Sequence, residues 1–292
     1  MKNGDIRYHF ARLNAAEKII VANTVVFLLV NLMAVLFGTN AANSITAWLE
    51  LPDDILEFLW KPWTIITYAF LHGGFFHIFW NMLLLYFFGR FFFNLFDSER
   101  FHAVYFLGVV AGGALFMLGY NIFPTLIDNS TVLIGASAGV TAVLIFICTY
   151  LPMQEVRIIF FNVKLWQLGL FVILKDIWTL STGQNVGGMM AHLGGAMLGY
   201  VFARQLLNGT DIGTGFTKLV NAIKDWFKPR EKKPFTNVYK NKAKAGTVSK
   251  AAYDKAARQK KIDAILDKIS KSGYESLSRD EKDFLFKAGK ED

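Results

Sequence analysis

Cysteine is almost absent from this 292-residue chain, and the single cysteine, Cys148, lies within a long apolar run. One cysteine can form neither an internal disulfide nor a cysteine metal site, so both are excluded. Charged residues are also few, at 18% of the chain, and they gather toward the two ends. A long middle section nearly without charge, in a chain that is 53% hydrophobic, is typical of a membrane protein.

The formal net charge of +8 is the feature that could indicate nucleic-acid binding. The lysines and arginines, however, flank apolar segments and are not interleaved with exposed aromatic residues. An excess of positive charge on the cytoplasmic side of a membrane explains this distribution more simply. We therefore expect the lipid bilayer as a partner, and no nucleic acid.

Six apolar segments are candidates for membrane-spanning helices, since a helix needs about 20 apolar residues to cross the hydrocarbon core. The first is too long for a signal-peptide core and is read as an uncleaved anchor. The fourth and fifth are short, which suits helices packed inside a bundle. The sequence thus predicts an all-α polytopic membrane protein with a six-helix bundle. The segments are 19–38, 75–95, 101–120, 135–151, 165–180 and 186–203.

Lysine and arginine also predict the orientation of the bundle. Lys2, Arg7, Arg12 and Lys18 precede the first span, so the N-terminus is expected to be cytoplasmic, and an even number of spans returns the C-terminus to the same side. Beyond the spans, a capping box at Ser278 and Glu281 predicts a second short helix after an amphipathic one. The expected domains are a cytoplasmic N-terminal segment (1–18), the membrane domain (19–205), a basic linker (206–250) and a cytoplasmic helical hairpin (251–292).

Three side chains capable of chemistry fall at one depth of the predicted bundle. The second, fourth and sixth spans run in the same direction, and His77, Ser137 and His192 lie near the start of each. At 1.5 Å per residue, all three are within about 10 Å of the outer boundary. Ionisable groups within a span are costly and indicate function, although a structural histidine is the alternative for any one of them.

Small residues surround the serine and the sixth-span histidine. Ser137 lies in the run Gly135-Ala136-Ser137-Ala138-Gly139. His192, Gly195 and Gly199 share one side of the sixth helix, and such glycines allow another helix to approach closely. We expect His192 to act as general base, and later general acid, for a Ser137 nucleophile. His77 and Asn81, four residues apart, are expected to stabilise an oxyanion.

These residues resemble the rhomboid family of intramembrane serine proteases. The resemblance implies a bacterial six-helix protease with a soluble tail, a Ser137–His192 catalytic dyad, and oxyanion stabilisation by His77 and Asn81. It implies a structural or water-handling role for His72, with Gly135, Gly195 and Gly199 as supporting residues. No cofactor or metal is implied. The matching segments are 69–81, which contains His72, His77 and Asn81; Gly135-Ala136-Ser137; and Ala191-His192-Leu193-Gly194-Gly195 with Gly199.

Four positions depart from the family's pattern. Thr64 replaces the arginine of a Trp-Arg pair in the first outer loop, and Phe93 stands near a position that is often glutamate. Ala138 stands where glycine usually follows the serine, and Thr141 where a tyrosine often sits. These departures concern the first outer loop, the packing of the third helix and the substrate pocket. None removes a group expected to be catalytic.

Other functions remain as alternatives. A zinc protease usually needs His-Glu-x-x-His, and no acid lies between His72 and His77. A serine–lysine dyad with Lys175 is possible, but Lys175 is followed by Asp176, and a lysine that is paired or that extends its ammonium to the membrane surface is favoured. The main alternative is a catalytically silent rhomboid-like protein that escorts membrane clients.

For the protease we expect single-span membrane proteins as substrates, cut near the outer face of a bacterial inner membrane. We also expect the fifth helix, which carries Trp166, Phe171 and Trp178, to act as a lateral gate. The sequence indicates no partner for the tail.

Overall fold

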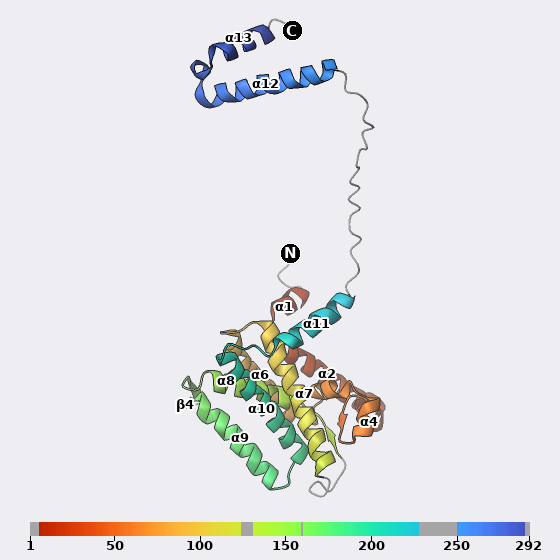
Figure 1. The fold of residues 1–292 in the computed structure, drawn as a ribbon. Helices are drawn as coiled ribbons and strands as arrows, with labels where there is room; N and C mark the ends of the chain where they lie inside the picture. Colours follow the sequence, from red (N-terminus) through yellow and green to blue (C-terminus); the bar gives the residue numbers. More distant parts are fainter. Residues whose placement is uncertain (1–5, 124–130, 159, 228–249, 290–292) are drawn as a thin grey trace. The chain divides into compact units, whose positions relative to one another are not determined.

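The computed structural model describes residues 6–123, 131–158, 160–227 and 250–289 (Figure 1). The chain forms two compact units, Met1–Lys228 and Pro229–Asp292. The predicted linker falls partly on residues 228–249, which lie outside the described ranges, as do the first five residues of the predicted N-terminal segment.

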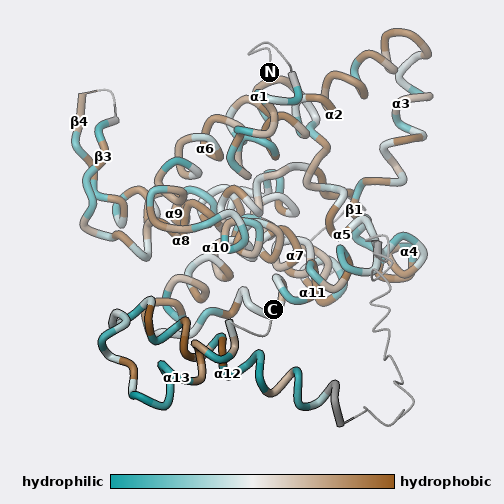
Figure 2. Tube along the Cα trace, turned by 90° about the horizontal axis from the view of Figure 1, so that it is seen from above, coloured by the Kyte–Doolittle hydropathy of each residue, from teal (hydrophilic) through white to brown (hydrophobic). Residues whose placement is uncertain are grey.

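The first unit contains the six expected helices, so the prediction of an all-α polytopic membrane bundle is confirmed. Four of them, α2, α6, α7 and α10, are long and apolar enough to cross a membrane, and α8 is a shorter apolar helix. Apolar colour dominates these helices in Figure 2, whereas the tail helices carry much polar colour. The six are α2 (Ala15–Phe37), α6 (Phe75–Phe93), α7 (Ser98–Ile122), α8 (Ser137–Tyr150), α9 (Leu165–Ser181) and α10 (Val186–Leu207).

Helix α8 is the central element of the bundle. Every residue from Ala138 to Cys148 is buried, which explains how a helix of 14 residues can be apolar on all sides. Helix α2 is the opposite case, because few of its residues are buried and many of its apolar side chains are exposed, as expected of a helix that faces lipid. Its start is fixed by a capping box in which Asn14 and Glu17 each accept the other's backbone N–H.

Small residues bring α7, α8 and α10 into backbone contact. On the α7 side, a side chain on Gly108 or Gly112 would collide with Ala142 or Ala138 of α8. From α10, a Cβ on Gly195 would overlap the carbonyl oxygen of Ala138. Close approach of this kind is the usual way in which membrane helices associate.

The segment between α2 and α6 packs in part against α7. Its buried Thr64 donates a hydrogen bond to the Lys61 carbonyl at 2.6 Å, and Trp63 Nε1 donates to the Trp48 carbonyl at 2.7 Å. These bonds stabilise the loop without the arginine that the family carries at position 64. The elements are α3 (Thr39–Thr46), β1 (Leu51–Pro52), α4 (Ile55–Trp60), α5 (Thr64–Thr67) and the 3₁₀ helix η1 (Tyr68–Phe70), with β1 paired antiparallel to β2 (Val132–Leu133).

Two short elements lie at the ends of the bundle helices. Helix α1 (Ile6–Arg12) precedes α2, and the hairpin of β3 (Glu155–Ile158) with β4 (Phe161–Lys164) leads into α9. Phe93, the second departure from the family, packs against the Phe101 ring of α7 at a centroid distance of 4.9 Å. An aromatic contact therefore joins α6 to α7 at this position.

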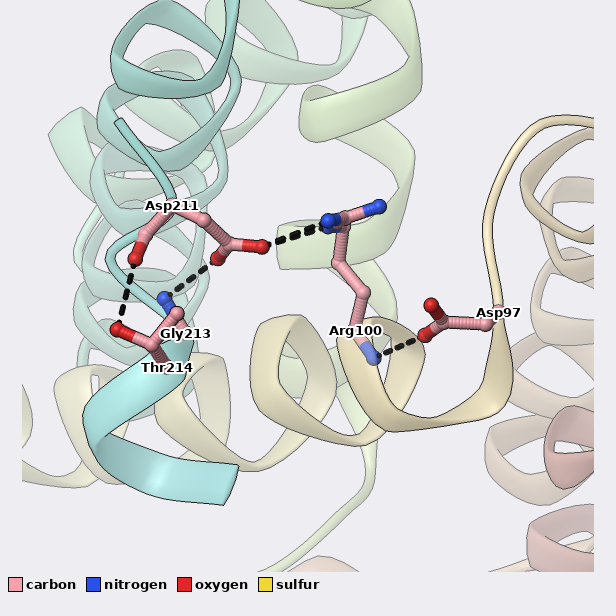
Figure 3. A network of polar contacts seen from close by, with 5 residues as sticks. All are labelled: Asp97, Arg100, Asp211, Gly213 and Thr214. Atoms are coloured by element: carbon pink, nitrogen blue, oxygen red, sulfur yellow. Dashed lines mark hydrogen bonds and ion pairs between the residues drawn. The ribbon is translucent and has the colours of Figure 1, made fainter. Parts of the chain in front are cut away.

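A further helix, α11 (Thr214–Phe227), occupies part of the segment expected to be a linker. Figure 3 shows how it is tied to α7. Both Nε and Nη2 of Arg100 donate to Asp211 Oδ2, at 2.9 and 2.7 Å, and Asp211 Oδ1 accepts the Gly213 N–H at 2.9 Å. The prediction of a linker over all of 206–250 is therefore wrong for residues 214–227. The basic residues and prolines that predict a linker lie mostly beyond α11, in residues 224–250.

The second unit is the expected helical hairpin. It consists of α12 (Lys250–Ser272), the 3₁₀ helix η3 (Tyr274–Ser276) and α13 (Arg279–Ala288). Gly273 ends α12 with a positive φ of 78°, and the Ser278–Glu281 capping box starts α13 as predicted. Lys268 of α12 forms an ion pair with Glu281 of α13 at 2.8 Å, which joins the two helices.

Candidate active site

Ser137 is the first residue of α8, and the turn before it depends on glycine. Gly135 has a φ of +120°, a conformation that side-chain-bearing residues rarely adopt, and its N–H donates to the Tyr68 carbonyl at 2.9 Å. This turn places the serine at a helix N-terminus, where unpaired backbone N–H groups and the helix dipole favour negative charge.

His192 lies on α10, one turn before the glycine that contacts α8. Asn185 caps α10, with its side chain accepting the Gly188 N–H at 3.3 Å. Gly195 packs against the backbone of Ala138, the residue after Ser137, so His192 lies near the level of the serine. Gly199 makes the same contact with Ala142 one turn further on, so two of the three predicted supporting glycines, Gly195 and Gly199, lie in the α8–α10 interface.

The four residues expected to perform chemistry line one cavity of about 1090 Å³. Ser137 comes from α8, His192 from α10, and His77 and Asn81 from α6. Thr141, one of the departures from the family, also lines it. Among the described residues, Ser137 Oγ and His192 are not joined by a hydrogen bond. In free enzymes such bonds are often long and shorten only when substrate binds.

The two residues expected to stabilise an oxyanion differ in their hydrogen bonding. The His77 ring lies against Gly135, since a Cβ there would be 2.6 Å from His77 Nε2 and 3.8 Å from Ser137 Oγ. Buried Asn81 donates one amide hydrogen to the His77 carbonyl at 2.9 Å. An amide nitrogen carries two donors, so the second hydrogen of Asn81 is not used by this bond.

His72 lies just before α6 and packs edge-on against His77, with ring centroids 4.9 Å apart. Both of its ring nitrogens are buried, and neither has a hydrogen-bond partner in the described protein. Burial, and to a lesser extent the neighbouring His77, lowers the pKa of His72 to about 4. The ring is therefore neutral at neutral pH.

One residue of the site was missed by the sequence analysis. Asp176 of α9 has a fully buried side chain, and its Oδ2 lies 3.1 Å from Nδ1 of His192. Its Oδ1 lies 2.8 Å from the Lys175 ammonium, in ion-pair contact but without hydrogen-bond geometry. Of the two alternatives favoured for Lys175, the structure thus shows the paired one. A buried acid within a predicted span was the available signal for Asp176.

The described residues hold no group of three or more histidine, cysteine, aspartate or glutamate side chains that could bind a metal ion. The residues that line the cavity offer groups that acyl transfer can use. These groups are a hydroxyl at a helix N-terminus, an imidazole whose other nitrogen contacts a carboxylate, and further donors that line the same cavity.

The first unit is thus a polytopic membrane bundle in which a serine and a histidine from different helices line one cavity. A family model described as the Rhomboid domain matches residues 59–209, slightly more than half of the chain. The chain belongs to the rhomboid family. A second model, described as a family of unknown function (DUF6576), matches residues 249–288, which form the α12–α13 hairpin.

Two curated relatives are similar to part of this chain. The chain is 31% identical over 159 residues to "RHOMBOID-like protein 12, mitochondrial" of Arabidopsis thaliana, covering 50% of this chain and 47% of that protein. It is 28% identical over 138 residues to "Presenilin-associated rhomboid-like protein A, mitochondrial" of Danio rerio, covering 46% and 35%. The chain thus spans less than half the length of either relative.

Proposed function

We propose that this protein is an intramembrane serine endopeptidase. The observation that carries the proposal is the convergence of Ser137, His192, His77 and Asn81, from three helices, on one cavity. Membership of the rhomboid family supports it. A client-binding protein without activity would have no need of a hydroxyl and an imidazole that line the same cavity.

The chemistry has two stages. Ser137 Oγ attacks the scissile carbonyl carbon as Nε2 of His192 takes its proton, and the oxyanion accepts hydrogen bonds from the Ser137 N–H, His77 and Asn81. His192 then returns the proton to the amide nitrogen as the C–N bond breaks. Water, deprotonated by the same imidazole, hydrolyses the acyl-enzyme and restores the serine.

We infer that the substrate is a single-span membrane protein that enters beside α9. Peptide bonds within a helix are shielded by their own hydrogen bonds, so the cut segment must unwind. Glycine, proline or polar residues near the cut are therefore expected. Phe171 lines the cavity and is 64% exposed, which places α9 between the site and the surroundings of the bundle (Figure 1).

We also propose that both termini face the cytoplasm of a bacterial cell and that the cut lies near the outer face of its inner membrane. The lysines and arginines around α1 and after α10 support this orientation. The names of the two relatives state a mitochondrial location, which applies to those proteins. Reporters fused at the C-terminus test the orientation, and we expect activity from one that works only in the cytoplasm. Activity only from a reporter that works in the periplasm would show the opposite orientation.

Cleavage of a model single-span substrate in liposomes tests the enzymatic proposal. The wild-type protein is expected to cut the substrate, and Ser137→Ala to be inactive while its thermal unfolding is unchanged. Equal cleavage by both would overturn the nucleophile assignment. Binding of the substrate without cleavage by the wild type would favour the client-escorting alternative.

A further inference from the structure

We propose that Asp176 is a positioning residue for His192, so that the site works as a serine–histidine–aspartate triad and not as a dyad alone. This inference rests on the proposed protease function and extends it to a residue of α9. Its basis is the 3.1 Å contact between Asp176 Oδ2 and Nδ1 of His192, made by a carboxylate with no exposed surface.

The contact fixes which nitrogen of His192 is the base. An imidazole that donates its Nδ1–H to a carboxylate leaves Nε2 as the unprotonated nitrogen. Nε2 is the atom that must face the serine hydroxyl if His192 is to take its proton. The carboxylate also favours the imidazolium formed after that transfer, while the Nδ1 proton stays on the histidine.

The surroundings of Asp176 support a function beyond packing. An uncompensated carboxylate inside a bundle is very unfavourable, so its presence needs partners. The partners are His192 on one oxygen and the ammonium of Lys175, itself half-exposed, near the other. His77, which also lines the cavity, carries no negative charge. Asp176 is therefore the acid that can orient the base among the described cavity residues.

The test compares Asp176→Asn with wild type, using kcat and KM for the model substrate from pH 5 to 9. We expect kcat to fall by on the order of 100- to 10,000-fold with little change in KM. We also expect the midpoint of the acidic limb to move to lower pH. Asp176→Glu, which keeps a carboxylate, is expected to recover part of the rate and the wild-type limb. Asp267→Asn, on the exposed face of α12, is the matched control and should behave as wild type.

A purely structural role would lower the unfolding temperature of Asp176→Asn and leave the position of the acidic limb unchanged, and that result would overturn the proposal. Wild-type kcat in a folded Asp176→Asn variant would also overturn it while leaving the protease function intact. A wild-type protein that neither cleaves nor reacts with a serine probe would overturn both.

A second measurement needs no folded variant of Asp176. In the ¹⁵N spectrum of wild-type protein with labelled histidine, the His192 signal, assigned through His192→Gln, should show a protonated Nδ1. A signal with the proton on Nε2 at neutral pH contradicts the positioning role.

Discussion

Gly195 of α10 lies directly against the carbonyl oxygen of Ala138, the residue that follows Ser137 in α8. This contact leaves no room for a side chain and determines how closely the helix of the base approaches the helix of the nucleophile. The separation of the serine from the imidazole therefore depends on a hydrogen atom at position 195.

Replacing Gly195 by alanine should separate α8 from α10. The added Cβ overlaps backbone, which cannot move as a flexible side chain could, so we expect a loss of about 1–3 kcal/mol in stability. A displacement of about 1 Å between reacting groups can lower a rate on the order of 100-fold. We therefore expect the cleavage rate to fall strongly even if the variant stays folded. Gly215→Ala in α11, where a Cβ meets nothing within 4 Å, is the matched control. Full activity of Gly195→Ala would contradict the close-approach argument.

Replacing Gly135 by alanine should impair the site without altering the helix contacts. Alanine at a φ of +120° is strained, and its Cβ would fall on the His77 ring. We expect cleavage to fall by about tenfold or more, since each oxyanion donor is typically worth 100-fold or more. Gly74→Ala, where the space is open, should retain wild-type cleavage in the same assay.

Loosening α9 should raise cleavage if this helix gates substrate entry. Phe171 lines the cavity and its side chain is largely exposed, so Phe171→Ala removes bulk at the entrance. Leu174→Ala, at an exposed position of α9 that does not line the cavity, is the control. The measurement is the initial rate with a full-length membrane substrate. An unchanged or lower rate in a stable Phe171→Ala variant would count against gating at α9.

Acid should destabilise the protein partly through His72. The folded state holds this ring neutral, with its pKa lowered to about 4, whereas the unfolded chain binds a proton below about 6.5. Protons therefore favour unfolding as the pH falls from 6.5 toward 4. His72→Phe removes this group, so its unfolding temperature should depend less steeply on pH in that window. Identical slopes for the two proteins would show that His72 is not held neutral by the fold.

The Arg100–Asp211 ion pair should anchor α11 to α7. Both side chains are about one quarter exposed, so Arg100→Met leaves a poorly solvated carboxylate, and we expect a loss of about 1–2 kcal/mol on thermal unfolding. Lys271→Met breaks an exposed pair in α12 and should cost less than about 0.5 kcal/mol. Equal effects of the two variants would mean that Asp211 does not anchor the helix.

Much of this architecture could be predicted because the bilayer imposes it on the sequence. Apolar runs of the required length locate the spans. The positions of Ser137 and His192 in the sequence then assign them to the fourth and sixth spans. Asp176 could not be paired with His192 in this way. The two lie 16 residues apart on different helices, and only the rotation of α9 against α10 decides that they meet. Helix α11 was not predicted, because the basic, proline-containing stretch that follows it indicated a linker over the whole segment.

Reaction of the purified protein with a fluorophosphonate probe, followed by mass spectrometry of the adduct, tests the central claim most directly. We predict a covalent adduct on Ser137 that is absent from Ser137→Ala and strongly reduced in His192→Gln. A folded wild-type protein that does not react, or an adduct on a different serine, would contradict the account.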